Sequence, residues 1–297
     1  MKVLCIGNAA YDITYSMDDY PIENFKYRMK NKYIGGGGPS SNAAYLLGKW
    51  GAKTYFAGAV GDDTLGKKII KEFKSVGVST KYIEIDRGRD TTLAFILLNE
   101  SKGSRTIFTY REDTLVLDKK IKEKFDYILM DGQEYEASMF VLDKNPNAIS
   151  IIDAGRATEK VIELCKKVTY VVCSKKFAED YTKMQIDINN NESMNQVLDL
   201  MLKDFKNVVI TLEESGSIYK KDGILNYVPS IKVEVKDSTG AGDLFHGAFT
   251  YFLVNGYPFE RIIKLSNITG ALSVTKIGGR NSVPSLGEVL LAEKENV

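Results

Sequence analysis

Residues 150–173 read SIIDAGRATEKVIELCKKVTYVVC, and this stretch contains the pattern that decides the fold. Residues 150–152 and 170–173 are short apolar runs, and residues 159–167 between them have helical spacing. Continuous apolar strands are buried on both faces, as in a parallel sheet covered by helices. The stretch therefore predicts one β-α-β unit of a doubly wound α/β fold.

The same alternation extends over most of the chain. Further buried strands are predicted at residues 2–6, 54–60, 127–130 and 208–210. Further helices are predicted at residues 42–50, 65–76, 177–183 and 194–206. Strands and helices that alternate in this way favour a parallel sheet with helices on both faces.

Two segments interrupt this rhythm. Residues 12–34 are polar and aromatic without a helical stripe, and residues 91–110 contain two apolar runs around the turn Lys102-Gly103. We interpret them as a small β lid formed by residues 13–34 and 91–110. The main domain then comprises residues 1–12, 35–90 and 111–297. An edge extension of the main sheet fits the pattern equally well.

Charge, histidine and cysteine content exclude several classes of protein. Lys plus Arg is 40 and Asp plus Glu is 39, and a net charge of +1 is too small for a general nucleic-acid binder. No apolar run approaches the ~18 residues of a membrane span. His246 is the single histidine, which excludes multi-histidine zinc sites. Cys5, Cys165 and Cys173 are expected to be buried reduced thiols of a cytoplasmic protein.

The strongest local motif is DSTGAGD at residues 237–243, between a predicted strand at 233–235 and a helical pattern that begins at Leu244. Glycines let the backbone approach a ligand, and a helix N-terminus offers free N–H groups. The motif therefore predicts an anion hole suited to phosphate. Asp243 lies in the first helical turn, where a carboxylate either caps the helix or accepts a proton from an attacking hydroxyl.

A second motif, GGGGPSSN, occupies residues 35–42. Four glycines bring bare backbone against a neighbour, and Asn42 either caps the following helix or binds a sugar hydroxyl. Taken alone the motif is weak, because most glycine-rich loops are only loops.

The two motifs in this order, together with the lid segments, resemble the ribokinase-like (PfkB-type) family of carbohydrate kinases over nearly the full chain. The resemblance implies a Rossmann-like α/β/α sandwich with a mostly parallel central sheet and a small β-sheet lid. It also implies transfer of the ATP γ-phosphate, with Mg²⁺, to a hydroxyl of a small sugar, either a hexose, a ketohexose or a pentose.

The resemblance assigns roles residue by residue. Asp243 is implied as the catalytic base, and Gly240, Ala241 and Gly242 as the anion hole. The implied sugar-binding residues are Asp12, Gly37, Gly38 and Asn42. The implied nucleotide-binding residues are Thr211, Gly216, Ser174 and Asn267. A monovalent cation site, which would make the protein potassium dependent, is implied at Asp237, Thr239, Ser273, Lys276, Gly278 and Ser282.

Two motifs of the family are altered in ways similar to ketohexokinase-like members. The family's N-x-x-E motif is replaced by Ser174-Lys175-Lys176-Phe177, with Glu179 out of register, and the TxGxxG motif at residues 211–216 lacks its middle glycine. Because of these departures, the sequence does not decide which residues contact the nucleotide and the magnesium ion. Arg105 in the lid turn is interpreted as a solvated charge, with a contact to substrate or phosphate as the alternative.

Other functions stay open at this point. A nucleoside kinase on the same fold is the first alternative, since 17 tyrosines and 13 phenylalanines supply aromatic rings without showing where they gather. A catalytically silent sugar-binding regulator is the second, although it has no need of Asp243. A metal-dependent hydrolase ranks last. The expected partners are sugar and ATP, neither nucleic acid nor membrane, and a second copy of the chain paired through the lid.

Overall fold

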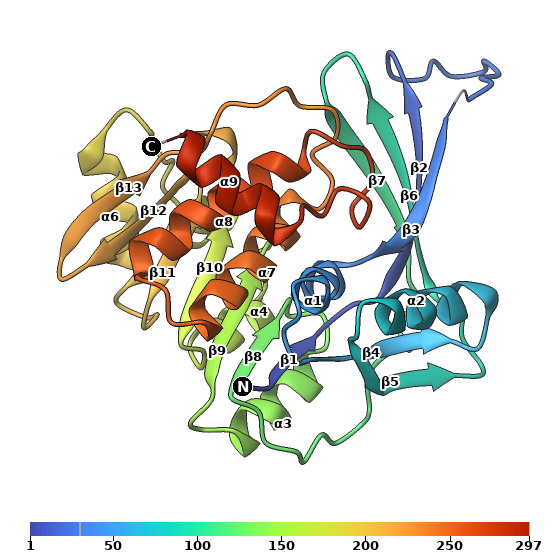
Figure 1. The fold of residues 1–297 in the computed structure, drawn as a ribbon, viewed down its shortest axis with the longest axis horizontal. Coiled ribbons are helices and arrows are strands. Elements are labelled where there is room, and N and C mark those ends of the chain that lie inside the picture. The colour runs from blue at the N-terminus through green and yellow to red at the C-terminus, as the bar shows by residue number, and fades with distance from the viewer. Residues whose placement is uncertain (30, 297) are drawn as a thin grey trace.

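The computed structural model describes residues 1–29 and 31–296, and its main body is built on a nine-stranded sheet (Figure 1). The strands of this sheet are β1 (Val3–Ile6), β4 (Thr54–Gly61), β5 (Ser79–Asp86), β8 (Tyr127–Met130), β9 (Ile149–Ala154), β10 (Tyr170–Ser174), β11 (Val208–Thr211), β12 (Ser217–Lys221) and β13 (Ile224–Val228). Their order is β13-β12-β11-β10-β9-β8-β1-β4-β5. All pairs from β5 to β11 are parallel, whereas the pairs β11–β12 and β12–β13 at one edge are antiparallel.

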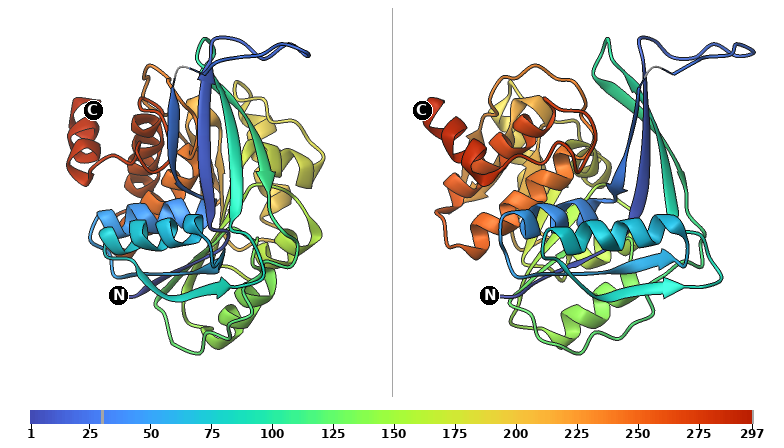
Figure 2. Two further views of the ribbon diagram at one scale, coloured as in Figure 1. Left: turned by 90° about the vertical axis from the view of Figure 1, so that its right-hand side faces the viewer. Right: turned by 45° about the vertical axis from the view of Figure 1, so that its right-hand side comes forward.

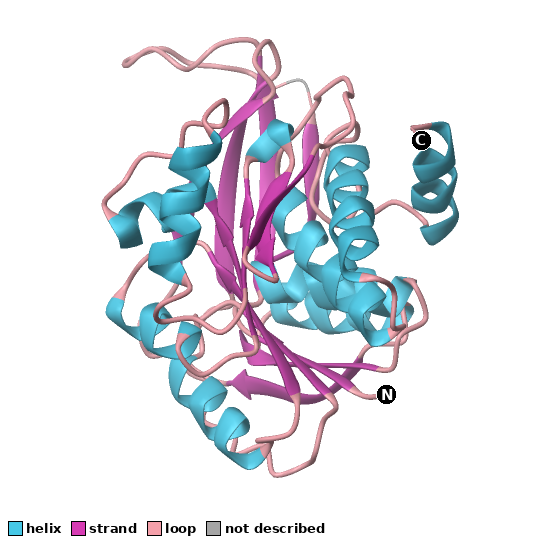
Figure 3. Ribbon diagram, turned by 90° about the vertical axis from the view of Figure 1, so that its left-hand side faces the viewer, coloured by secondary structure: helices cyan, strands magenta, loops and turns pink. Residues whose placement is uncertain are grey.

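Helices cover both faces of this sheet (Figure 3). One group is α1 (Pro39–Lys49), α2 (Thr64–Ser75), α7 (Ala241–Val254) and α8 (Phe259–Ser273), with α9 (Leu286–Glu295) packed on α8. The other group is α3 (Tyr135–Lys144), α4 (Glu159–Cys165), α5 (Lys175–Thr182) and α6 (Asn191–Met201). A 3₁₀ turn, η1 (Glu213–Ser215), follows β11. The predicted α/β/α sandwich with a mostly parallel sheet is confirmed.

The core lies on both sides of the sheet because successive side chains of a strand point to opposite faces. In β1, Val3 and Cys5 belong to the apolar cluster under α1 and α7, whereas Leu4 and Ile6 belong to the cluster under α3–α6. All four side chains are fully buried. The continuous apolar strands of the sequence are therefore explained by two-sided burial.

A separate four-stranded sheet forms the lid. Its order is β3-β2-β6-β7, with bounds Lys32–Gly37, Ala10–Met17, Thr92–Asn99 and Ser104–Tyr110. Figure 2 shows this sheet rising away from the main sheet at an angle. Within the described residues no lid strand pairs with the nine-stranded sheet, so the edge-extension alternative is wrong.

The strand predicted at residues 233–235 is wrong, because this segment pairs with no strand in the described part of the chain. The N–H groups of Lys236 and Asp237 both donate to the carbonyl of Val274, in the turn after α8. The side chain of Val235 lies against Gly103 in the lid turn. Val235 thus contacts the lid turn and takes no part in a sheet.

The prediction that the three cysteines are buried is confirmed. Cys5, Cys165 and Cys173 are free and buried. Over residues 1–29 and 31–296, no helix combines the length and the apolar character needed to cross a membrane.

Candidate active site

The N-terminus of α7 presents free backbone N–H groups. Gly240 is the N-cap residue and has a φ of 80°, a left-handed conformation that favours glycine. The Ala241 N–H makes only a long contact of 3.4 Å to the carbonyl of Ser238. Among the described residues, the N–H groups of Gly242 and Asp243 find no protein acceptor. The loop therefore keeps the donors that an anion requires.

The carboxylate of Asp243 is held by a residue from the other end of the chain. Its Oδ2 accepts a hydrogen bond of 2.7 Å from Nδ2 of Asn42, in the first turn of α1. The structure records no side-chain cap for α7, so this contact replaces the capping bond that the sequence left as an alternative. A Cβ on Gly279 would lie 3.3 Å from the Asn42 amide nitrogen, so the glycine keeps this junction open. The N-termini of α1 and α7 thus meet at the carboxylate.

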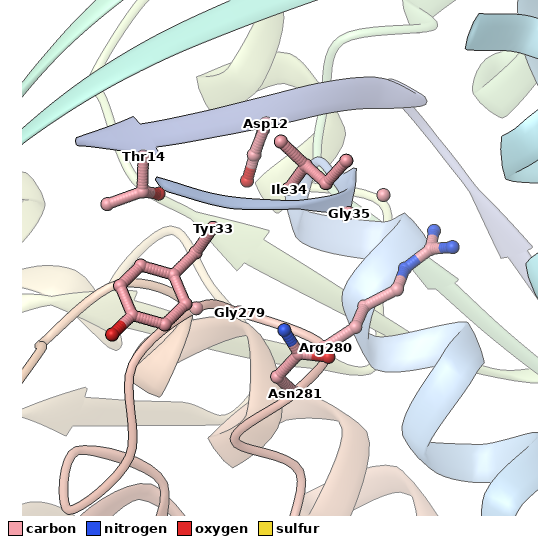
Figure 4. Close-up of a pocket in the computed structure, with 10 residues that line it drawn as sticks. Asp12, Thr14, Tyr33, Ile34, Gly35, Gly279, Arg280 and Asn281 are labelled. Carbon is pink, nitrogen blue, oxygen red and sulfur yellow. The ribbon is translucent and has the colours of Figure 1, made fainter. Parts of the chain in front are cut away.

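A pocket between lid and main domain contains Asp12 (Figure 4). Asp12 and Thr14 of β2 and Tyr33 of β3 line its lid side, and residues 278–281 line its other side. A Cβ on Gly37 would lie 2.2 Å from both carboxylate oxygens of Asp12, so this position in β3 must be glycine for the carboxylate to fit.

The electrostatics of this pocket are dominated by Asp12. Burial, and after it repulsion from Asp243, raise the pKa of the Asp12 carboxyl, Arg280 opposes the shift, and the net pKa is about 7. A carboxyl group with a strongly raised pKa in a cleft is typical of functional sites. It also indicates that Asp12 and Asp243 lie close enough to interact.

Sequence reasoning missed Arg280. Its side chain is buried, with Nη1 donating to Oε2 of Glu72 at 2.6 Å and Nη2 donating to Oγ of Ser41 at 2.5 Å. A Cβ on Gly36 would lie 2.3 Å from the guanidinium, so the glycine run makes room for this cation. The signal available in the sequence was an arginine directly after the pair Gly278-Gly279.

The Asp237 carboxylate connects two loops, its own loop that leads into the anion hole and the loop that contains Gly278. Its Oδ1 accepts from the N–H of Thr239 and its Oδ2 accepts from the N–H of Gly278, each at 2.9 Å. The Oγ1 of Thr239 is buried and has no partner among the described residues. The structure therefore brings together three of the residues assigned to a cation site, and one of them has an unused oxygen.

The other residues assigned to that site have partners of their own. The hydroxyls of Ser273 and Ser282 donate to the carbonyls of Gly270 and Gly279 at 2.6 and 2.7 Å. The ammonium of Lys276 lies 3.4 Å from the Glu288 carboxylate on the surface, so only its backbone could face a cation.

Two predicted nucleotide residues have structural contacts at the sheet edge. Asn267 of α8 is buried, with Oδ1 accepting from the hydroxyl of Ser217 at 2.7 Å and Nδ2 donating to the carbonyl of Val228 at 2.9 Å. Gly216 has a φ of 109°, and a Cβ there would lie 2.2 Å from the same carbonyl. Both residues fix the β12–β13 hairpin, and their contact with nucleotide stays a prediction.

The altered N-x-x-E stretch forms a helix start. The Oγ of Ser174 caps α5 by accepting from the N–H of Phe177 at 3.1 Å. Thr211, at the end of β11, donates its hydroxyl to the carbonyl of Cys173 at 3.2 Å. Glu179 accepts from the N–H of Ile186 at 3.0 Å, so its carboxylate is engaged in a loop. In the part of the chain that the structure describes, no cluster of three acidic, histidine or cysteine side chains could hold a metal ion.

The lid turn contacts the loop before the anion hole. Arg105 of β7 is exposed, as the solvated-charge interpretation expects, yet its Nη1 donates to Oγ of Ser238 at 2.6 Å. Ser238 in turn donates to the carbonyl of Gly103 at 3.3 Å. The lid therefore rests on the DSTGAGD loop itself.

Together, the α/β sandwich, the separate four-stranded sheet and the glycine loop at the start of α7 agree with the kinase architecture that the sequence predicts. Residues 1–286 match the model of the pfkB family carbohydrate kinases, and the chain belongs to this family. The resemblance found in the sequence is thereby confirmed, and the chain is an ATP-dependent carbohydrate kinase.

Relatives and solved structures agree with this family. The ribokinase of Lactococcus lactis is 25% identical, covering 99% of this chain and 97% of its own length. The bifunctional protein HldE of Helicobacter pylori is 26% identical over 98% of this chain, which spans only 66% of that longer protein. A proposed ribokinase from Agrobacterium tumefaciens superposes with a TM-score of 0.90 at 26% identity, covering 99% and 97% of the two chains.

Proposed function

We propose that this kinase phosphorylates a hydroxyl of a small sugar, a hexose, ketohexose or pentose, with Asp243 as the general base. The observation that carries the proposal is the Asp243 carboxylate, which Asn42 holds beside the free N–H groups of α7 and near the Asp12 pocket. Relatives named ribokinase and deoxyribokinase support a sugar as acceptor. ATP as donor and three free thiols favour the cytoplasm as the compartment.

The proposed mechanism uses few groups. Asp12 accepts hydrogen bonds from the sugar hydroxyls and orients the acceptor. The acceptor oxygen forms a bond to the γ-phosphorus as the bond from phosphorus to the ADP oxygen breaks, and the hydroxyl proton passes to a carboxylate oxygen of Asp243. The N–H groups of Gly242 and Asp243 stabilise the negative charge on the transferred group.

ATP supplies the phosphoryl group, and the orphan N–H groups at the start of α7 fit its phosphate oxygens. Ser174 and Glu179, which lie where the family's magnesium motif would be, are engaged in a helix cap and a loop. Mg²⁺ commonly binds through substrate phosphates and water, so we propose that it enters with the nucleotide. Thr211, Gly216, Ser174 and Asn267 are proposed to border the nucleotide through their backbone or loops.

A monovalent cation is proposed beside Asp237. The buried, unpartnered Oγ1 of Thr239 fits such a ligand, since a buried hydroxyl without a partner is costly. The cation would hold the two loops that Asp237 joins. We expect turnover to be higher in KCl than in tetramethylammonium chloride of equal ionic strength. Equal rates in the two salts would remove the cation from the proposal.

The function is tested with a panel of hexoses, ketohexoses, pentoses and nucleosides. Binding is measured by the rise in melting temperature with and without a non-hydrolysable ATP analogue, and turnover by sugar-dependent ADP formation. A sugar that raises the melting temperature and drives ADP formation supports the proposal. Turnover on nucleosides alone would favour the nucleoside kinase, and sugar binding without ADP formation would favour the silent regulator.

The outer face of the lid is proposed to pair with a second copy of the chain. Phe95, Phe108 and Tyr110 are 37%, 57% and 59% exposed, and the rings of Phe95 and Phe108 lie 6.1 Å apart. An exposed apolar patch marks an interaction surface. Phe108→Glu is expected to convert a dimer into a monomer by light scattering, whereas Ile224→Glu on the β13 edge serves as the exposed apolar control. A monomeric wild type would contradict the pairing.

A further inference from the structure

The single histidine lies directly beneath the anion hole, and the proposed mechanism does not use it. His246 is on α7, one turn after Gly242, and its side chain is buried. Its Nδ1 lies 2.6 Å from the carbonyl oxygen of Gly242, and its Nε2 lies 3.1 Å from the carbonyl oxygen of Val172 in β10. Both ring nitrogens therefore face oxygen atoms that can only accept hydrogen bonds.

Only one protonation state satisfies both contacts. A neutral imidazole has a single N–H and would turn the lone pair of its other nitrogen toward a carbonyl oxygen. An imidazolium donates from both nitrogens. A buried cation needs a counter-charge, and Oδ2 of Asp153, at the end of β9, lies 3.4 Å from Nδ1.

The other titratable groups around the ring are compatible with a cation. Burial raises the pKa of the Asp153 carboxyl, His246 lowers it and the charge of Asp243 raises it, and the net value of about 6 leaves Asp153 largely ionised at pH 7.5. Burial also raises the pKa of the Cys173 thiol, on β10, which therefore stays neutral. Asp153 and Asp243 are thus carboxylates that face this region, and the buried Asp131, whose pKa is raised to about 7, also interacts with Asp153.

We propose that His246 is a positively charged positioning residue, an imidazolium paired with Asp153, that fixes and polarises one N–H group of the anion hole. The carbonyl of Gly242 and the N–H of Asp243 belong to one planar peptide group. A charged donor on the carbonyl fixes the plane of that group and strengthens the N–H as a donor.

This inference rests on the proposed function, since a polarised N–H matters for phosphate transfer, but the protonation state can be measured without activity. In protein labelled with ¹⁵N-histidine and freed of any histidine tag, His246 gives the only imidazole signals. At pH 7.5 we expect both ring nitrogens of the ligand-free protein to carry a proton. One protonated and one unprotonated nitrogen would overturn the proposal.

Two variants test the role of the charge. His246→Phe keeps an aromatic ring without donors, and we expect it to lower kcat about 10-fold or more, below the 10²-fold loss typical of a direct oxyanion donor, with an unchanged KM for sugar. His246→Asn can restore a neutral donor to the Gly242 carbonyl and is expected to recover part of the loss. A folded His246→Phe enzyme with wild-type kcat would overturn the catalytic part of the inference.

A third variant separates this inference from the proposed function. Asp153→Asn removes the counter-charge, and we expect the histidine to lose one proton at pH 7.5 in the same spectra. An unchanged doubly protonated ring would show that Asp153 does not hold the charge and would overturn the pairing. Failure of Asp243 as a base would instead appear in turnover alone and leave these spectra unaffected. If His246→Phe does not fold, the spectra of the wild type and of Asp153→Asn still show whether His246 is charged and whether Asp153 holds that charge.

Discussion

Replacing Asp243 by asparagine is expected to lower kcat for sugar phosphorylation by at least ~10²-fold, the scale of losing a general base. The amide has nearly the same shape as the carboxylate, and its oxygen can still accept the hydrogen bond that Asn42 donates at 2.7 Å. It cannot take up the proton of the attacking hydroxyl. Sugar and nucleotide binding, measured by calorimetry, are therefore expected to persist while turnover is lost.

A matched control distinguishes a base from a carboxylate that only stabilises a helix. Glu192 also lies in the first turn of a helix, α6, but it is exposed. Neutralising a carboxylate at such a position costs about 0.3–1 kcal/mol of stability through the helix dipole. Glu192→Gln is expected to show at most this small loss and wild-type kcat. If Asp243→Asn behaves in the same way, with near-normal turnover, Asp243 is not the base.

The main sheet could be predicted because its strands carry a strong local signal. Residues 127–130 and 208–210 are apolar at every position and lie buried as β8 and β11. The β12–β13 hairpin lacks that signal because it forms an edge, where Ile224 is 68% exposed. Helix starts were displaced for a related reason. Ser174 begins α5 through its capping hydroxyl, whereas an apolar pattern becomes visible only at Phe177.

The site depended on contacts that local patterns cannot show. The motifs identified Asp243 and Asn42 separately, but the hydrogen bond between them spans 201 residues. Arg280 escaped prediction because arginine is rarely buried without a partner, and its partner Glu72 lies 208 residues away. The sequence indicated only that the glycines bring bare backbone against a neighbour. The reason for glycine at these positions is visible only in the folded structure, where Gly36 and Gly37 make room for the side chains of Arg280 and Asp12.

Asp12→Asn is expected to raise the KM for sugar about 10- to 10²-fold at pH 8, because a hydrogen bond to a charged group contributes about 1.5–3 kcal/mol. The effect on kcat is expected to be smaller, since Asp12 orients the acceptor and takes no proton. Steady-state kinetics with saturating ATP measures both constants. An unchanged KM at pH 8 would place the sugar elsewhere.

The pH dependence of sugar binding gives a second readout of the same carboxylate. Because the pKa of Asp12 is raised to about 7, the residue is largely protonated at pH 6 and ionised at pH 8. The KM of the wild type is therefore expected to fall as pH rises through this range, and the dependence is expected to vanish in Asp12→Asn. Asp131 and Asp153, whose pKa values are raised by burial to about 7 and about 6, remain in the variant. Any dependence left in the variant thus measures their contribution.

The same carboxylate is expected to cost stability when no sugar is bound. The pKa of Asp12 is about 3.9 in the unfolded chain and about 7 in the folded one, so the folded state holds the proton more tightly. The stability that comes from this tighter proton binding is fully present below the pKa of the unfolded chain, and it is lost as pH rises through the pKa of the folded chain, about 7. At pH 8, Asp12→Asn is therefore expected to melt at a higher temperature than the wild type without sugar, and at pH 4 this gain is expected to disappear.

Saturating sugar should raise the melting temperature of the wild type more than that of the variant, because only the wild type retains the charged acceptor. A variant that melts lower than the wild type at pH 8 without sugar would mean that Arg280 and its neighbours already compensate the charge of Asp12.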